Sequence, residues 1–188
     1  MRIISGSFKG KKILLPKDKL TRPLKDLTKE SIFNILKHSK LLNVELENSN
    51  ILDLFSGVGS FGLECLSRGA KNLTFLENYT EVLNILKKNI ASLNQQNQTK
   101  IIEKDIFSEN TLKLLNDKFD IIFMDPPYKE KKLSFLLNVI TKLKLLNTGG
   151  IIIIHRHKKE VDELPKEFNL ILEKNYGISK IIFGNILT

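Results

Sequence analysis

The sequence predicts an α/β protein built on a doubly wound, mostly parallel sheet of seven strands. From residue 51 onward, short apolar runs alternate with amphipathic stretches, which is typical of strands joined by crossover helices. A glycine-rich loop also joins the first of these runs to the first amphipathic stretch. The chain of 188 residues, 41% hydrophobic with one cysteine, is long enough to bury such a core without disulfides.

The spacing of apolar residues locates the elements. Residues 1–20 hold two short apolar runs around a turn and predict a small β-hairpin, and residues 25–38 predict a helix. We place a boundary in the polar stretch before residue 50, so that residues 1–48 form an extension and residues 49–188 the main domain. One strand is expected to run antiparallel at the sheet edge. In the main domain we expect strands at 51–55, 73–77, 100–103, 119–124, 151–154, 168–172 and 178–183, and helices at 61–67, 82–93, 112–115 and 133–146.

The net charge of +9 favours a polyanionic partner. The alternative is that a chain rich in lysine, asparagine and isoleucine merely carries a basic, solvated surface. The longest apolar runs have four residues, whereas a membrane span needs about 20. No signal peptide is recognisable, so we expect a cytoplasmic protein without a membrane partner. The candidate RNA contacts outside the main motifs are Arg2, Lys9, Lys11, Lys12, Arg22 and Lys129.

The loop that follows the first core strand predicts an adenosine-containing ligand. Gly57, Gly59 and Gly62 fit G-x-G-x-x-G, and Glu77 lies where a carboxylate can accept hydrogen bonds from ribose hydroxyls. Asp53 precedes the loop and would repel a pyrophosphate, but it would attract the ammonium and sulfonium of S-adenosylmethionine. The predicted cofactor site comprises Asp53, Phe55, Ser56, Gly57, Gly59, Glu77, Asn78, Asp105, Ile106 and Asp125. For Asp105, a helix N-cap remains an alternative role.

The segment Asp125-Pro126-Pro127-Tyr128 predicts the catalytic residues. The prolines fix the backbone and remove two N–H donors, so neighbouring carbonyls can face a ligand. The carboxylate of Asp125 and the carbonyl of Pro126 can orient the N–H groups of a nucleobase amine. Tyr128 can stack on the base, which contributes roughly 1–3 kcal/mol in single-stranded complexes. Methyl transfer then depends mainly on positioning.

The order of these motifs resembles the class I methyltransferases that depend on S-adenosylmethionine, a Rossmann-like fold. More closely, the chain resembles the bacterial RsmD-type enzymes. The resemblance covers Arg2 to Gly6, Thr21-Arg22-Pro23, Glu30 to Leu36, Leu52 to Gly57, Leu66 to Ala70, Asp125 to Tyr128, and Tyr176-Gly177. It implies transfer of a methyl group to N2 of guanine 966 in 16S rRNA. The partner it implies is an assembling or assembled small ribosomal subunit, and we expect a monomer.

The strand end at His155-Arg156-His157 departs from the resemblance, which leads us to expect a glutamate there. We expect His155 and His157 to lie at the surface or to contact phosphate, and we expect no metal site, because no cysteine accompanies them. The alternative functions are a DNA adenine-N6 or cytosine-N4 methyltransferase and a non-catalytic module that binds S-adenosylmethionine or RNA. An NAD-dependent oxidoreductase is disfavoured by Asp53.

Overall fold

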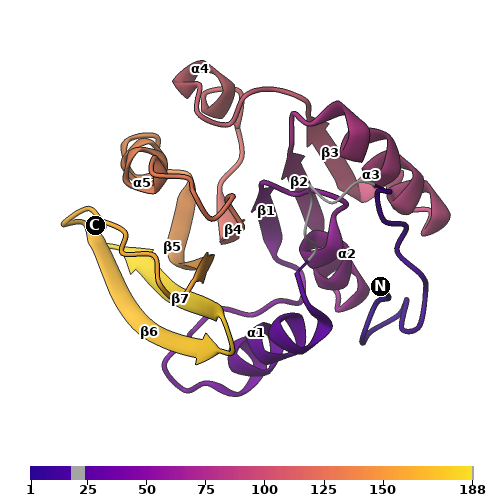
Figure 1. Ribbon diagram of the computed structural model, residues 1–188, viewed down its shortest axis with the longest axis horizontal. Coiled ribbons are helices and arrows are strands. Elements are labelled where there is room, and N and C mark those ends of the chain that lie inside the picture. The colour runs from indigo at the N-terminus through magenta and orange to yellow at the C-terminus, as the bar shows by residue number, and fades with distance from the viewer. Residues whose placement is uncertain (18–23, 188) are drawn as a thin grey trace.

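The computed structural model describes residues 1–17 and 24–187 and contains one seven-stranded sheet in the order β3-β2-β1-β4-β5-β7-β6 (Figure 1). The strands are β1 (Asn50–Leu54), β2 (Asn72–Leu76), β3 (Thr99–Ile102), β4 (Phe119–Met124), β5 (Leu146–His157), β6 (Phe168–Tyr176) and β7 (Ser179–Ile186). The helices are α1 (Asp26–His38), α2 (Ser60–Ser67), α3 (Thr80–Ser92), α4 (Glu109–Leu112) and α5 (Leu133–Lys142), and η1 (Gln96–Gln98) is a single 3₁₀ turn. The predicted fold class is confirmed.

Helices cover both faces of the sheet, with α1, α2 and α3 on one face and α4 and α5 on the other (Figure 1). Successive strand residues alternate between the two resulting cores: Ile121 and Phe123 face the first, and Ile122 and Met124 face the second. Because both faces are buried, the central strands are almost continuously apolar. This explains why residues 51–55 and 119–124 were recognisable as strands.

The antiparallel strand is not at the sheet edge, where we expected it. Strand β7 pairs antiparallel with both β5 and β6, so it lies inside the sheet and β6 forms the edge. A tight turn at Gly177, with φ +59°, joins β6 to β7 and sends the chain back between β6 and β5. The periodicity of apolar residues identifies both strands but carries no information about their order.

The two ends of the α5–β5 connection also differ from the prediction. Helix α5 ends at Lys142 because Lys144 adopts a left-handed conformation, with φ +52°, and residues 143–145 close the last turn. Strand β5 starts at Leu146 and includes Gly149 and Gly150, with a register shift against β4 between Phe119 and Ile121. The predicted strand started at residue 151, so the structure extends it by five residues at its amino end, and the two glycines form an irregular part of β5.

The N-terminal hairpin exists in a minimal form and is attached to the main domain. A single antiparallel bridge joins Arg2 to Lys12. The backbone N–H groups of Ile4 and Ser5 donate to the buried carboxylate of Glu64 in α2, at 2.8 and 3.0 Å. The side chains of residues 3, 13, 32, 33 and 36 belong to the same apolar core as α2 and α3. The domain boundary between residues 48 and 49 therefore stays a prediction. In the structure, side chains from both sides of it belong to one apolar core.

The parallel strands bring the predicted site residues to one edge of the sheet. From β1 the chain moves outward to β2 and β3 and then returns to place β4 on the other side of β1. Ligands of such sheets usually bind where the strand order reverses, outside the carboxyl ends of the strands, which here are those of β1 and β4; we call this place the crevice. Asp53 lies near the end of β1, Glu77 follows β2, Asp105 follows β3 and Asp125 follows β4.

Candidate active site at the carboxyl edge of the sheet

Asp53 is a buried carboxyl group that caps helix α2. Its Oδ2 accepts a hydrogen bond from the backbone N–H of Gly62 at 3.0 Å. The residue at the N-cap position of α2 is Gly59, which has no side chain to accept that bond. Asp53 therefore has a structural role in addition to the ligand role predicted for it.

The environment of Asp53 is unfavourable for a negative charge. Burial raises its pKa well above the usual range, the Gly62 N–H opposes this, and the nearby carboxyls of Asp125 and Glu77 add to the increase. Three carboxyl groups thus gather at the ends of β1, β2 and β4. Such a group favours a cationic ligand and disfavours an anionic one.

Glu77 connects the loops that follow β1 and β2. Its Oε2 accepts from the Gly57 N–H at 2.8 Å, and its Oε1 accepts from the N–H groups of Asn78 and Tyr79, both at 2.9 Å. A carboxylate has about four acceptor positions. One position on Oε2 is therefore left for a ligand, beside a Gly57 whose φ is +53°.

Three other residues of the glycine loop, Phe55, Ser56 and Gly59, make contacts within the protein. The Ser56 hydroxyl donates to the Asp53 carbonyl at 2.5 Å and accepts from the Leu76 N–H at 3.0 Å, which ties β1 to β2. At Gly59, a Cβ atom would lie 2.5 Å from Leu86 Cδ1, so this glycine permits close packing of the core. Phe55 adopts φ +60°, and its ring centroid lies 5.7 Å from that of Phe107.

The residues after β3 divide between surface and core. Asp105 is exposed and accepts from the Phe107 N–H at 3.0 Å, forming a local turn. The N-cap of α4 is Ser108, so Asp105 does not occupy the N-cap position considered as its alternative role. The Ile106 side chain is buried in the core beneath α4 and α5.

Asp125 is held through one of its two oxygens. The distance from Asp125 Oδ1 to His155 Nδ1 is 2.7 Å, and His155 Nε2 lies 2.9 Å from the Ser179 hydroxyl. Among residues 1–17 and 24–187 no hydrogen bond to Asp125 Oδ2 is seen, and the side chain is 21% exposed. Asp125 thus offers a free acceptor oxygen to the crevice.

The expectation that both histidines lie at the surface is wrong for His155, which is buried with 6% exposure. It pairs with Ile181 of β7, just beyond the last residue of β5 that pairs with β4, and each ring nitrogen has a protein partner. His157 is partly exposed, and its ring centroid lies 5.3 Å from that of Tyr128 in an edge-to-face arrangement. Tyr128 is itself partly buried, beside these two rings.

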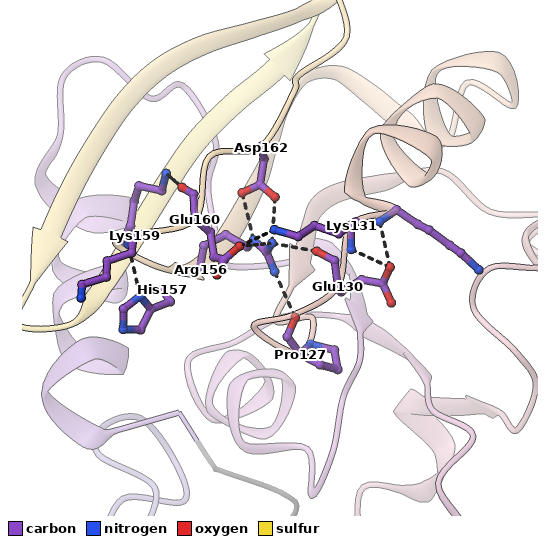
Figure 2. A network of polar contacts seen from close by, with 10 residues as sticks. Pro127, Glu130, Lys131, Arg156, His157, Lys159, Glu160 and Asp162 are labelled. Atoms are coloured by element: carbon purple, nitrogen blue, oxygen red, sulfur yellow. Dashed lines mark hydrogen bonds and ion pairs between the residues drawn. The ribbon is translucent and has the colours of Figure 1, made fainter.

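Arg156 fixes the loop that carries the predicted catalytic residues (Figure 2). Its fully buried guanidinium binds Asp162 through two bonds of 2.9 and 2.8 Å. It also donates to the carbonyls of Pro127 at 3.1 Å and Glu130 at 2.8 Å. The Pro127 carbonyl therefore faces Arg156 and not the crevice. Sequence reasoning missed this residue, although an arginine at the end of an isoleucine run was a usable signal.

The predicted basic residues lie in two places. Arg2, Lys9, Lys11 and Lys12 are exposed on the N-terminal segment, whose turn contacts Ser67 at the far end of α2. We call these four residues the basic flank. Its turn lies at the end of α2 away from the crevice, whereas Leu14, two residues after Lys12, is bonded to Asn89, which also donates to the Val58 carbonyl of the glycine loop. Lys129 is exposed directly beside Tyr128, and Arg22 lies outside the described residues.

Two negative observations concern the described part of the chain. Between residues 1–17 and 24–187, no three His, Cys, Asp or Glu side chains are grouped so that they could hold a metal ion. In the same residues, the helices are too short or too polar to span a membrane.

Comparison with known proteins shows the family to which the chain belongs. A family model described as "Conserved hypothetical protein 95" matches residues 1–185. The chain is 34% identical over 176 residues to "Ribosomal RNA small subunit methyltransferase D" of Buchnera aphidicola, covering 92% of this chain and 86% of the relative. It is 31% identical over 183 residues to the protein of the same name from Haemophilus influenzae, with 95% and 90% covered.

A solved structure of the Escherichia coli methyltransferase yhhF superposes with a TM-score of 0.80. It is 26% identical and matches 100% of this chain and 98% of its own. Fold, motif order and relatives agree with one another along nearly the whole length. The chain is therefore a member of the RsmD family, within the class I methyltransferase fold.

Proposed function

We propose that this protein transfers a methyl group from S-adenosylmethionine to the exocyclic N2 amine of a guanine in 16S rRNA, at the position numbered 966. The observation that carries the proposal is Asp125, whose Oδ1 is held by His155 while Oδ2 is free to accept a bond from an amine N–H. The printed names of the relatives supply the substrate class, ribosomal RNA of the small subunit.

The donor set at the crevice fits S-adenosylmethionine. Glu77 retains an acceptor position for a ribose hydroxyl beside Gly57, and Asp53 and Asp125 surround the place where a positive head group would lie. A dinucleotide would bring a pyrophosphate to the same carboxyls and be repelled. Asp105 and Ile106, after β3, are the residues we assign to the adenine, with Phe55 and Phe107 close by.

When bound, S-adenosylmethionine supplies a methyl group on a positive sulfur, and its transfer leaves the C–S bonding pair on sulfur. The amine of guanine is a weak nucleophile because its lone pair is delocalised into the ring. Asp125 Oδ2 orients the amine by accepting one N–H and accepts the proton that the nitrogen loses once it is methylated. The partial exposure of Asp125 lets that proton pass on to solvent.

Tyr128 and the basic residues are the side chains that we assign to RNA binding. We assign the Tyr128 ring to stacking on the target base, because His157 supports it from the side. Lys129 and the basic flank of Arg2, Lys9, Lys11 and Lys12 contact phosphates, and Arg22 is the remaining candidate for that role.

The direct test is mass spectrometry of 16S rRNA from a strain that lacks this gene. We expect the loss of one N2-methylguanosine, which returns when the wild-type gene is supplied and stays absent with an Asp125→Ala copy. An unchanged modification pattern in the deletion strain would refute the substrate assignment. Loss of a methyl group at a different nucleotide would retain the chemistry and correct the position.

A further inference from the structure

We propose that His155 is a positioning residue for the reaction: it holds one oxygen of Asp125 so that the other oxygen meets the amine. The inference rests on the proposed function, because it concerns the same site. Neither the family motif nor the sequence analysis gives His155 this role.

The His155 ring has a hydrogen-bond partner at each of its two nitrogens. Its ring lies between Asp125 Oδ1, at 2.7 Å from Nδ1, and the Ser179 hydroxyl, at 2.9 Å from Nε2. The backbone on either side is held in the sheet, with His155 opposite Ile181 in β7. A ring held at both nitrogens and at its backbone has little freedom to move, so it determines where the carboxylate points.

The chemistry of the partners selects one tautomer. An ionised carboxylate can only accept, so Nδ1 carries the hydrogen that is donated to Asp125. Nε2 is then the acceptor for the Ser179 O–H. Asp125, after β4, is the charged group bonded to the ring, and the centroid of the Tyr128 ring lies 6.4 Å from that of His155 in an edge arrangement.

The connectivity from Ser179 through His155 to Asp125 is that of a serine-hydrolase triad, but the burial differs. Ser179 is 5% exposed at the start of β7, so a substrate cannot reach its hydroxyl. The accessible end of this chain of bonds is Asp125. The arrangement therefore orients an acceptor at the crevice and does not activate a nucleophile.

The test is single-turnover methylation of small subunits from the deletion strain, with saturating S-adenosylmethionine and RNA. We expect His155→Ala to lower the rate about 100-fold, as expected for misplacement of a reacting group, while the dissociation constants for S-adenosylmethionine and RNA stay within about two-fold. His155→Asn should recover much of the rate, because the asparagine amide can donate from near the Nδ1 position. His38→Ala, an exposed histidine at the end of α1, is the matched control and should be neutral.

A double-mutant comparison distinguishes positioning through Asp125 from a general structural effect. In the Asp125→Asn background, His155→Ala should lower the rate no further, because the residue acts through the missing carboxylate. An equal additional loss in that background, or failure of His155→Asn to recover any activity in a folded protein, would overturn the proposal. So would a His155→Ala rate equal to that of the wild type.

A measurement without turnover completes the test. In ¹⁵N NMR of the wild type, His155 should show a protonated Nδ1 and an acceptor Nε2, and Asp125→Ala should abolish the preference. If the wild type transfers no methyl group although this tautomer is observed, the proposed function fails, but the hydrogen bond from His155 to Asp125 is confirmed. If methyl transfer occurs and the ring shows the opposite tautomer, the inference alone fails.

Discussion

At the scale of single residues, Asp53 has two requirements that oppose each other. Its carboxyl caps α2 through Gly62, for which a neutral acceptor would be sufficient. In the ligand role that we propose for it, the carboxyl must be ionised inside the protein, although burial raises its pKa. When no cation is bound, this buried negative charge lowers the free energy of unfolding.

We therefore expect Asp53→Asn to increase the free energy of unfolding at neutral pH and to weaken S-adenosylmethionine binding. The folded-state pKa is raised well above its ordinary value of 3.8, so the wild type loses stability as the pH rises from about 3.8 through the folded pKa. Asparagine keeps the acceptor for Gly62 and cannot ionise. Urea unfolding at several pH values checks this, and a stability gain that persists below pH 3.8 would contradict the explanation.

Glu77→Ala should raise the dissociation constant for S-adenosylmethionine about ten-fold or more, since a bond to a charged acceptor contributes roughly 1.5–3 kcal/mol. The measurement is titration calorimetry on protein whose fold is verified by circular dichroism. Glu103→Ala is the matched control, because Glu103 is an exposed carboxylate after β3 that pairs with Lys87. Equal affinities for wild type and Glu77→Ala would remove Glu77 from the cofactor site.

At the scale of elements, the strands and helices were predictable because their apolar residues follow the periods of buried strands and helices. Each of the seven strands and five helices overlaps its predicted range, although α4 does so only at Leu112 and one end each of α5, β5 and β6 is off by four or five residues. The left-handed Lys144 explains the error at the end of α5. What sequence could not give is which elements become neighbours. His155 and Arg156 bond to residues 30 and 29 positions earlier in the chain, and only the β4–β5 pairing brings them together.

Arg156, in β5, holds the loop that follows β4 through hydrogen bonds to the carbonyls of Pro127 and Glu130. Arg156→Ala leaves the Asp162 carboxylate, which is 6% exposed, without its partner. Breaking a buried pair in this way costs about 3–5 kcal/mol, which for a chain of this size lowers the melting temperature by roughly 6–20 °C. Calorimetry checks this value. Lys131→Ala is the control, because it removes a mainly exposed ion pair with Glu160 on the same loop and should cost under about 1 kcal/mol.

At the scale of the whole molecule, the net charge is +9, whereas three carboxyl groups, those of Asp53, Glu77 and Asp125, gather at the crevice. An acidic crevice suits the cationic cofactor, and basic surfaces outside it suit the RNA. The basic flank is fixed to α2 and α3 through Ser67 and Asn89, so it presents its lysines on a rigid support. In the proposed function, RNA binding and methyl transfer thus rely on different residues.

Replacing Lys9, Lys11 and Lys12 together with Ala should weaken RNA binding and flatten its salt dependence. Each lost phosphate contact on single-stranded RNA changes the slope of log affinity against log salt by about 0.7, so three contacts amount to about 2. The charge-matched control replaces Lys100, Lys118 and Lys144, which are exposed near the amino ends of β3, β4 and β5. If both triple variants change the slope equally, the flank is no specific RNA contact.

In the proposed function, Asp125 positions the amine for methyl transfer without supplying most of the RNA affinity. Single-turnover methylation with saturating S-adenosylmethionine, measured beside an RNA-binding titration, tests it most directly. For Asp125→Ala we predict a rate at least about 100-fold below that of the wild type, with RNA affinity changed by less than about three-fold, because most of that affinity comes from phosphate contacts. A near wild-type rate in the folded variant would reduce Asp125 to Tyr128 to a rigid turn and would contradict the catalytic assignment.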